Sequence, residues 1–143
     1  MPRFAVRWLV HGTLATAGLL AIAITAAGQA PPPGDDPRFT GISTVLDGKD
    51  LSAARRRFEP GARSAWHSHD NGQLLYVEQG RMRTQKKGQP VLELGVGQSD
   101  YTGPNVVHWH GAAAGTHLLQ VNVGFGGETR WMQKVSDAEY GGK

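Results

Sequence analysis

From Phe39 onward, the sequence consists of short segments rich in β-forming residues, separated by glycine-containing turn signals such as Glu59-Pro60-Gly61 and Asp70-Asn71-Gly72. No apolar pattern with a long helical period lies between them. Many short strands with close turns predict an all-β sandwich or barrel. The expected strands are 53–58, 64–69, 74–77, 81–85, 91–94, 99–102, 107–111 and 117–123.

A sheet of this kind has exposed edges that must be hidden. Closure into a barrel or a two-sheet jelly roll hides them and leaves an interior able to hold a small ligand. Near the C-terminus, Ser136 is followed three residues later by Glu139, which is the pattern of a helix capping box. We therefore expect a jelly-roll β-barrel that ends in a short helical turn.

The N-terminal region differs from the rest of the chain. Arg3 and Arg7 precede an apolar run over residues 8–27, and small residues follow it. This order is typical of a secretory signal peptide, and the run approaches the length of an uncleaved anchor. We predict a signal peptide or membrane anchor at 1–30, a Pro-rich linker at 31–37 and one domain at 38–143. The protein is then periplasmic or secreted, and it contacts a membrane only through an uncleaved leader.

Charge and cysteine content exclude several classes of function. The chain has 15 Lys and Arg against 12 Asp and Glu, and two of the basic residues lie in the leader, so the domain is close to neutral. The basic run Arg55-Arg56-Arg57 lacks interleaved aromatic residues, so we interpret it as a solvated strand edge and expect no nucleic-acid partner. The absence of cysteine excludes thiolate metal sites and cysteine nucleophiles.

The five histidines outside the leader form two clusters: His67 and His69 in one, and His108, His110 and His117 in the other. Residues i and i+2 of a strand point to the same face, so each His-x-His pair projects two imidazoles together. If the two strands meet inside a barrel, the imidazoles converge around a transition metal: Mn, Fe, Co, Ni, Cu or Zn.

Further residues complete the expected site. Gln73 follows the turn after His69 and is placed to supply a neutral amide oxygen as a fourth ligand. A hairpin over residues 112–115 would set His117 opposite His110, with His117, Leu119 and Val121 facing the interior. His110 and His117 are then candidate proton donors or acceptors, the alternative being a packing or orienting role for one of them.

These motifs resemble those of a known superfamily. Gly61, His67-x-His69, Gln73 and Gly80 resemble the first motif of the cupins, with glutamine where glutamate is usual, and Gly97 through Pro104 to His108 resembles the second. The resemblance implies a jelly-roll β-barrel. It also implies a metal site with the ligands His67, His69, Gln73 and His108.

A narrower resemblance is to the small bacterial cupins that include manganese-dependent hydroxynitrile lyases. It is carried by RFTG (38–41), FEPGARSAWHSH (58–69), HWHGAA (108–113) and WMQKVSDAEY (131–140). It implies manganese as the metal and a homodimer or higher homo-oligomer, whereas the donor set itself also accepts Fe, Cu, Ni, Co or Zn. His110 and His117 match two pocket histidines of that group, although the loop between them is shorter here.

The leading hypothesis is a hydroxynitrile-lyase-like C–C lyase with a small-molecule substrate and a metal centre of three histidines and one glutamine. One alternative keeps the site and changes the chemistry to that of a quercetinase-like, metal-dependent dioxygenase. The other is a non-enzymatic, secreted cupin that binds a metal or a ligand.

Overall fold

The structure is a computed structural model that describes residues 38–143. The predicted leader (1–30) and linker (31–37) lie outside the described residues. By the contacts between residues, the chain divides into two compact units between Val45 and Leu46, and every strand belongs to the second unit. The domain start at residue 38 therefore stays a prediction. Among the described residues, no helix has the length and apolar character needed to cross a membrane.

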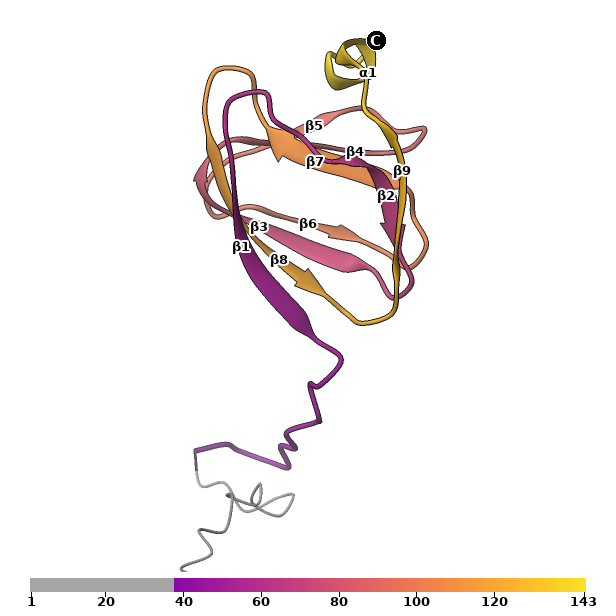
Figure 1. The fold of residues 1–143 in the computed structure, drawn as a ribbon. Coiled ribbons are helices and arrows are strands. Elements are labelled where there is room, and N and C mark those ends of the chain that lie inside the picture. Colours follow the sequence, from indigo (N-terminus) through magenta and orange to yellow (C-terminus); the bar gives the residue numbers. More distant parts are fainter. Residues whose placement is uncertain (1–37) are drawn as a thin grey trace, which may run out of the picture. The chain divides into compact units, whose positions relative to one another are not determined.

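The described residues form nine strands and one short helix (Figure 1). Most bounds lie within one or two residues of the expected segments, but the strand expected at 74–77 is longer and runs through Gly80. They are β1 (Ser52–Phe58), β2 (Ala65–His69), β3 (Gln73–Gly80), β4 (Met82–Lys86), β5 (Leu92–Leu94), β6 (Ser99–Thr102), β7 (His108–Ala112), β8 (Leu118–Gly124), β9 (Thr129–Lys134) and α1 (Asp137–Tyr140).

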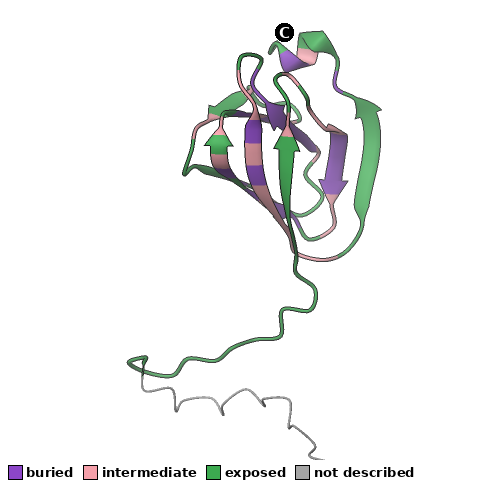
Figure 2. Ribbon diagram, turned by 60° about the vertical axis from the view of Figure 1, so that its left-hand side comes forward, coloured by how far each residue is buried: buried purple, intermediate pink, exposed green. Residues whose placement is uncertain are grey.

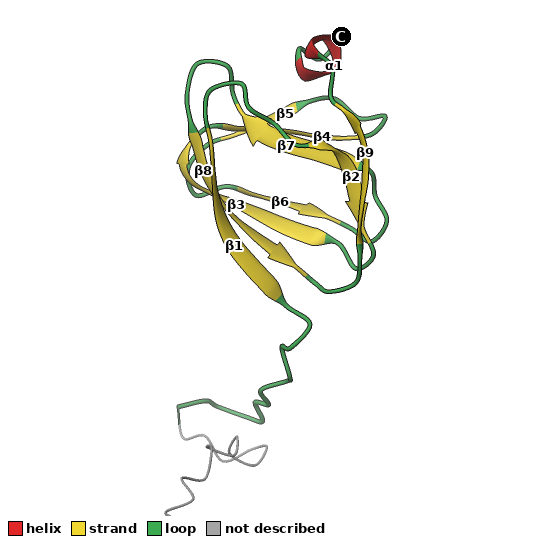
Figure 3. Cartoon of the chain, viewed as in Figure 1, coloured by secondary structure: helices red, strands yellow, loops and turns green. Residues whose placement is uncertain are grey.

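The strands build two antiparallel sheets that face each other (Figure 3). One sheet has the order β1-β8-β3-β6, and the other has the order β5-β4-β7-β2-β9. Strands that are consecutive in the chain thus often lie in different layers. This confirms the predicted all-β jelly roll.

The predicted hairpin between the strands of His110 and His117 is wrong. β7 pairs with β2 and β4, whereas β8 pairs with β1 and β3, so the chain crosses from one sheet to the other between them. Leu118 and Gln120 are fully buried on β8, whereas Leu119 and Val121 are only partly buried. The even-numbered residues of β8 face inward, rather than the predicted odd-numbered ones.

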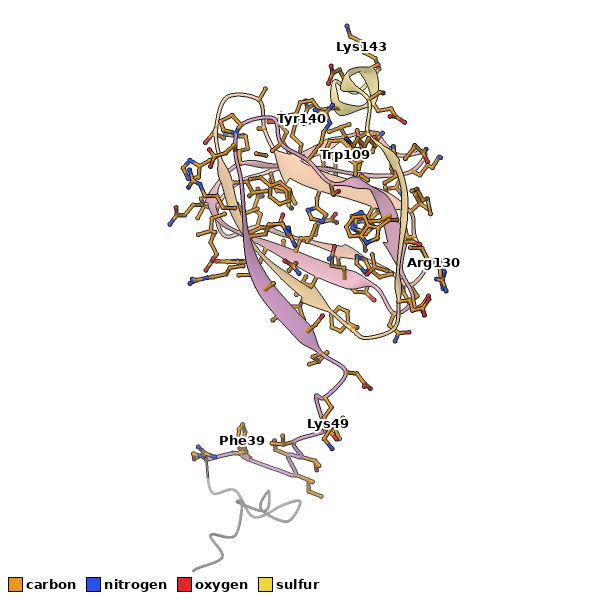
Figure 4. The ribbon with its side chains drawn as sticks, viewed as in Figure 1. Phe39, Lys49, Trp109, Arg130, Tyr140 and Lys143 are labelled. Atoms are coloured by element: carbon orange, nitrogen blue, oxygen red, sulfur yellow. The ribbon has the colours of Figure 1, made fainter. Side chains whose placement is uncertain are left out.

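The space between the sheets contains an apolar cluster of Leu75, Val77, Met82, Ala112 and Leu118. A second cluster lies on the other side of β2 and β7 and consists of Trp66, Trp109, Val135 and Tyr140. Figure 4 shows Trp109 beside Tyr140 of α1, and their ring centroids are 5.7 Å apart. Because Trp66 and Trp109 alternate with the histidines, this outer packing holds the imidazoles on the inner face.

The short helix α1 is confirmed, including its capping box. The Ser136 hydroxyl accepts a hydrogen bond from the Glu139 backbone N–H, and the Glu139 carboxylate accepts one from the Ser136 backbone N–H. The Glu139 carboxylate also accepts a hydrogen bond from the Trp66 indole N–H at 3.1 Å. The helix is thereby attached to the strand that carries His67 and His69.

Candidate metal centre

The two His-x-His pairs lie on neighbouring strands. β2 and β7 run antiparallel, and His67 is directly opposite His108. The ligand nitrogens of His67, His108 and His110 all lie within 4.8 Å of one another, and the three residues are buried. The predicted convergence of imidazoles from two separate stretches of chain is present.

The remaining predicted ligands adjoin this group. The His69 ring centroid lies 5.0 Å from that of His67 and 5.5 Å from that of His108. Gln73 begins β3 in the opposite sheet, and its Oε1 lies 3.2 Å from Nε2 of His108. The fold thus brings His67, His69, Gln73 and His108 together, with His110 as a fifth member. The tightest trio contains His110 rather than His69.

Hydrogen bonds at Nδ1 distinguish three of these rings from the fourth. Nδ1 of His67 donates to the Ala65 carbonyl at 2.9 Å, and Nδ1 of His108 donates to the Val106 carbonyl at 3.2 Å. Nδ1 of His69 lies 2.9 Å from the Thr129 hydroxyl. A proton held at Nδ1 leaves the Nε2 lone pair free to bind a metal.

Two observations test whether these residues fit a metal ion. Nε2 of His69 is buried and has no hydrogen-bond partner among the described residues. With its proton on Nδ1, His108 also turns the Nε2 lone pair toward the acceptor oxygen of Gln73. The 3.2 Å between these two atoms is short enough for both of them to bind one ion. Imidazole nitrogens and an amide oxygen are donors that suit first-row divalent ions, so the residues fit such an ion.

Burial keeps the imidazoles uncharged. Loss of hydration lowers the pKa of His67 and of His108 to about 4, and it lowers the pKa of His110 well below its ordinary value. The pKa of His69 is also lowered by burial. Neutral rings are the form that coordinates metals, so the site is ready to bind an ion at neutral pH.

A cavity of about 420 Å³ adjoins the cluster. His67, His69, Gln73 and His110 reach it, so a small molecule in the cavity meets the metal-binding atoms. Trp131 of β9 covers one side, with its ring centroid 4.6 Å from that of His67. His110 also contacts the edge of the Phe58 ring, and its Nδ1 is buried without a hydrogen-bond partner in the described part of the chain.

His117 does not share this position. It is partly buried just before β8, its backbone carbonyl accepts a hydrogen bond from Arg81, and it is not among the described residues that line the cavity. Its catalytic role stays a prediction.

Sequence reasoning missed Arg56, Asn122 and Trp131, all of which line the cavity. Alternation along the first strand could have identified Arg56, because it has the same parity as the apolar residue Phe58.

Comparison with known proteins gives consistent matches. A family model described as a cupin domain matches residues 54–122. An (R)-mandelonitrile lyase from Granulicella tundricola is 39% identical over 108 residues, which is 73% of this chain and 79% of that protein. A cupin-like protein from Thermotoga maritima has a TM-score of 0.63 and 32% identity, covering 80% of this chain and 93% of its own. A DMSP lyase structure has a TM-score of 0.52 and 25% identity, covering 59% and 45% respectively.

Proposed function

Because this chain belongs to the cupin superfamily, we propose that it is a metal-dependent lyase that cleaves 2-hydroxynitriles into a carbonyl compound and hydrogen cyanide. The relatives and the imidazole cluster together support a metal-type cupin enzyme that acts on a small molecule. The observation that carries the finer proposal is a neutral, buried imidazole, His110, beside a group of metal-binding donors at the wall of the cavity.

In this proposal His67, His69, Gln73 and His108 hold the metal. Their support is the Nδ1 hydrogen bonding of the three histidines and the short contact between His108 and Gln73. When bound, the ion supplies a Lewis acid that makes a neighbouring hydroxyl group more acidic. We propose manganese from the likeness to the lyases, and the donor set also accepts Fe, Co, Ni, Cu and Zn.

His110 is the proposed acid–base residue. Its imidazole is neutral at pH 7 and accepts the proton of the substrate hydroxyl. As the C–C bond breaks, its electron pair leaves with cyanide, and the C–O bond becomes a carbonyl. The imidazolium then returns the proton to cyanide, which leaves as hydrogen cyanide. Phe58 packs edge-on against the ring and restricts its orientation.

The first prediction tests this role. His110→Ala should lower kcat for mandelonitrile cleavage by about 100-fold or more, because general acid–base catalysis contributes that much. Bound metal, measured by elemental analysis of the same samples, should stay at the wild-type level. The control is His67→Ala, which should lose both metal and turnover. Wild-type turnover by His110→Ala would show that the proposed role is wrong.

The alternatives differ in what they consume. A quercetinase-like dioxygenase would take up O₂ when phenolic substrates are added, whereas the lyase needs no oxidant. An oxygen electrode therefore separates the two reactions. A binding protein without activity would retain a ligand in stoichiometric amount and turn over neither class of substrate.

A further inference from the structure

The arginine run on β1 is divided between the two faces of the strand. Arg55 and Arg57 pair with carboxylates on the outer side: Arg55 with Glu78 at 2.5 Å, and Arg57 with Glu59 at 2.8 Å. Arg56, between them, lines the cavity together with Ser52 and Phe58, which share its parity. The run is therefore two surface ion pairs and one cation at the cavity.

Arg56 has no carboxylate partner within the described residues. None of the cavity-lining residues in residues 38–143 is an aspartate or a glutamate. The other cavity arginine, Arg63, is already engaged: its guanidinium donates to the Val135 carbonyl and to Asp137 at 2.6 Å, and it stacks on the Tyr140 ring. Arg56 thus supplies a positive charge that the folded protein leaves uncompensated.

Buried amide groups adjoin Arg56 on the same inner face. Gln120 of β8 lies directly opposite it and is fully buried, and within the described chain neither of its amide atoms has a hydrogen-bond partner in good geometry. Asn122, two residues further along β8, lines the cavity, and its Oδ1 is likewise buried and unpaired. Gln120 does not line the cavity and lies beside His110, and the Asn122 Oδ1 accepts hydrogen bonds as a carboxylate does. These amides make the wall polar, and Arg56 is the group in this part of the wall that attracts an anion.

We propose that Arg56 is the anion-binding residue of this cavity and that the substrate carries a carboxylate. The group would bind at Arg56, on the sheet that faces the histidines, while the rest of the molecule reaches the imidazole cluster. A guanidinium matches a carboxylate with two parallel hydrogen bonds, and no acidic side chain among the described cavity residues competes for it. That the substrate carries a carboxylate rests on the proposed function. That Arg56 binds an anion in the cavity does not.

The binding test uses the metal-loaded protein and two probes of nearly equal shape, benzoate and benzamide. Isothermal titration calorimetry should show a benzoate Kd about tenfold higher for Arg56→Gln than for wild type, which is near the lower end for losing hydrogen bonds to a charged group. The matched control Arg57→Gln removes the same charge from the outer face and should leave the benzoate Kd unchanged. Benzamide should bind all three proteins equally.

Equal benzoate affinity in Arg56→Gln and wild type would overturn the proposal. So would an equal loss in Arg57→Gln, because the effect would then be one of net charge. Absence of benzoate binding by the wild type would also overturn it. Unchanged benzamide binding shows that the variants keep the folded cavity.

The turnover test compares a 2-hydroxynitrile bearing a carboxylate with its methyl ester. Arg56→Gln should raise KM about tenfold for the acid alone, while kcat stays near the wild-type value. If the wild type cleaves neither compound, the proposed lyase function fails. The calorimetric pattern still decides the role of Arg56 in that case, so the two failures are distinguishable.

Discussion

At the residue scale, the site depends on which ring nitrogen of each histidine is occupied. Backbone carbonyls hold Nδ1 of His67 and His108, and the Thr129 hydroxyl lies beside Nδ1 of His69. Because a carbonyl only accepts, it fixes the tautomer and aims Nε2 at the shared centre. His110 has no such partner for Nδ1 among the described residues, which separates it chemically from the other three.

The Thr129 contact yields a prediction. Thr129→Val keeps the side-chain shape but removes the hydroxyl beside Nδ1 of His69, so the metal Kd should rise about 10-fold, the lower end for loss of such a partner. A competition titration with a fluorescent chelator measures it. The control is Thr116→Val. It removes a hydroxyl that donates a hydrogen bond to the backbone carbonyl of His117, away from the site. An unchanged Kd would mean that Thr129 does not orient the ring.

The depressed histidine pKa values give a pH dependence. His67 and His108 have pKa values of about 4 when folded, against 6.5 in an unfolded chain. Between these values the unfolded state binds protons that the folded state excludes, so stability rises with pH in this window. The free energy of unfolding of chelator-treated protein should therefore fall as pH decreases from about 6.5 to 4. Urea denaturation at pH 7.5, 5.5 and 4.5 measures this, and a flat profile would contradict it.

At the scale of elements, turn signals made most strands predictable, whereas β9 was missed. Every residue of β9 is exposed, and Trp131 is 65% exposed, so the segment shows no alternation between buried and solvated positions (Figure 2). Its strand conformation comes from pairing with β2, which a local pattern does not reveal. The same pairing places Trp131 over His67, so the missed strand forms part of the site.

Gly111 of β7 lies against the backbone of Ala62 and Arg63, and this close approach gives another prediction. A Cβ at Gly111 would lie 2.4 Å from the Ala62 carbonyl oxygen and 2.5 Å from Arg63 Cα. Gly111→Ala should therefore lower the free energy of unfolding by about 1–3 kcal/mol, the range for overpacking. It should also lower turnover by displacing the adjacent His110. Gly115→Ala, where nothing lies within 4 Å of the added Cβ, is the control and should be nearly neutral in thermal and urea denaturation.

At the scale of the whole molecule, the site joins the two sheets. His67, His69, His108 and His110 come from one layer and Gln73 from the other, so an ion held by both would link the layers. Such an ion binds only the folded state and should stabilise it by about 2.7 kcal/mol at a free metal concentration of 100 times Kd. Differential scanning calorimetry with and without Mn²⁺ should show this as a rise in Tm. His67→Ala should abolish the rise, and an equal rise in that variant would place the metal elsewhere.

The amino-acid sequence by itself determined the all-β class, the terminal helix and the residues that gather around the site. The two-residue period of a strand suffices to put His67 with His69 and His108 with His110, whatever the rest of the chain does. Only the tertiary structure decided that β7 and β8 lie in different sheets, that Leu118 rather than His117 points inward, and that Arg56 reaches the cavity. The physical reason is that alternation defines two faces of a strand but does not say which is buried. That choice depends on pairing between strands far apart in the sequence.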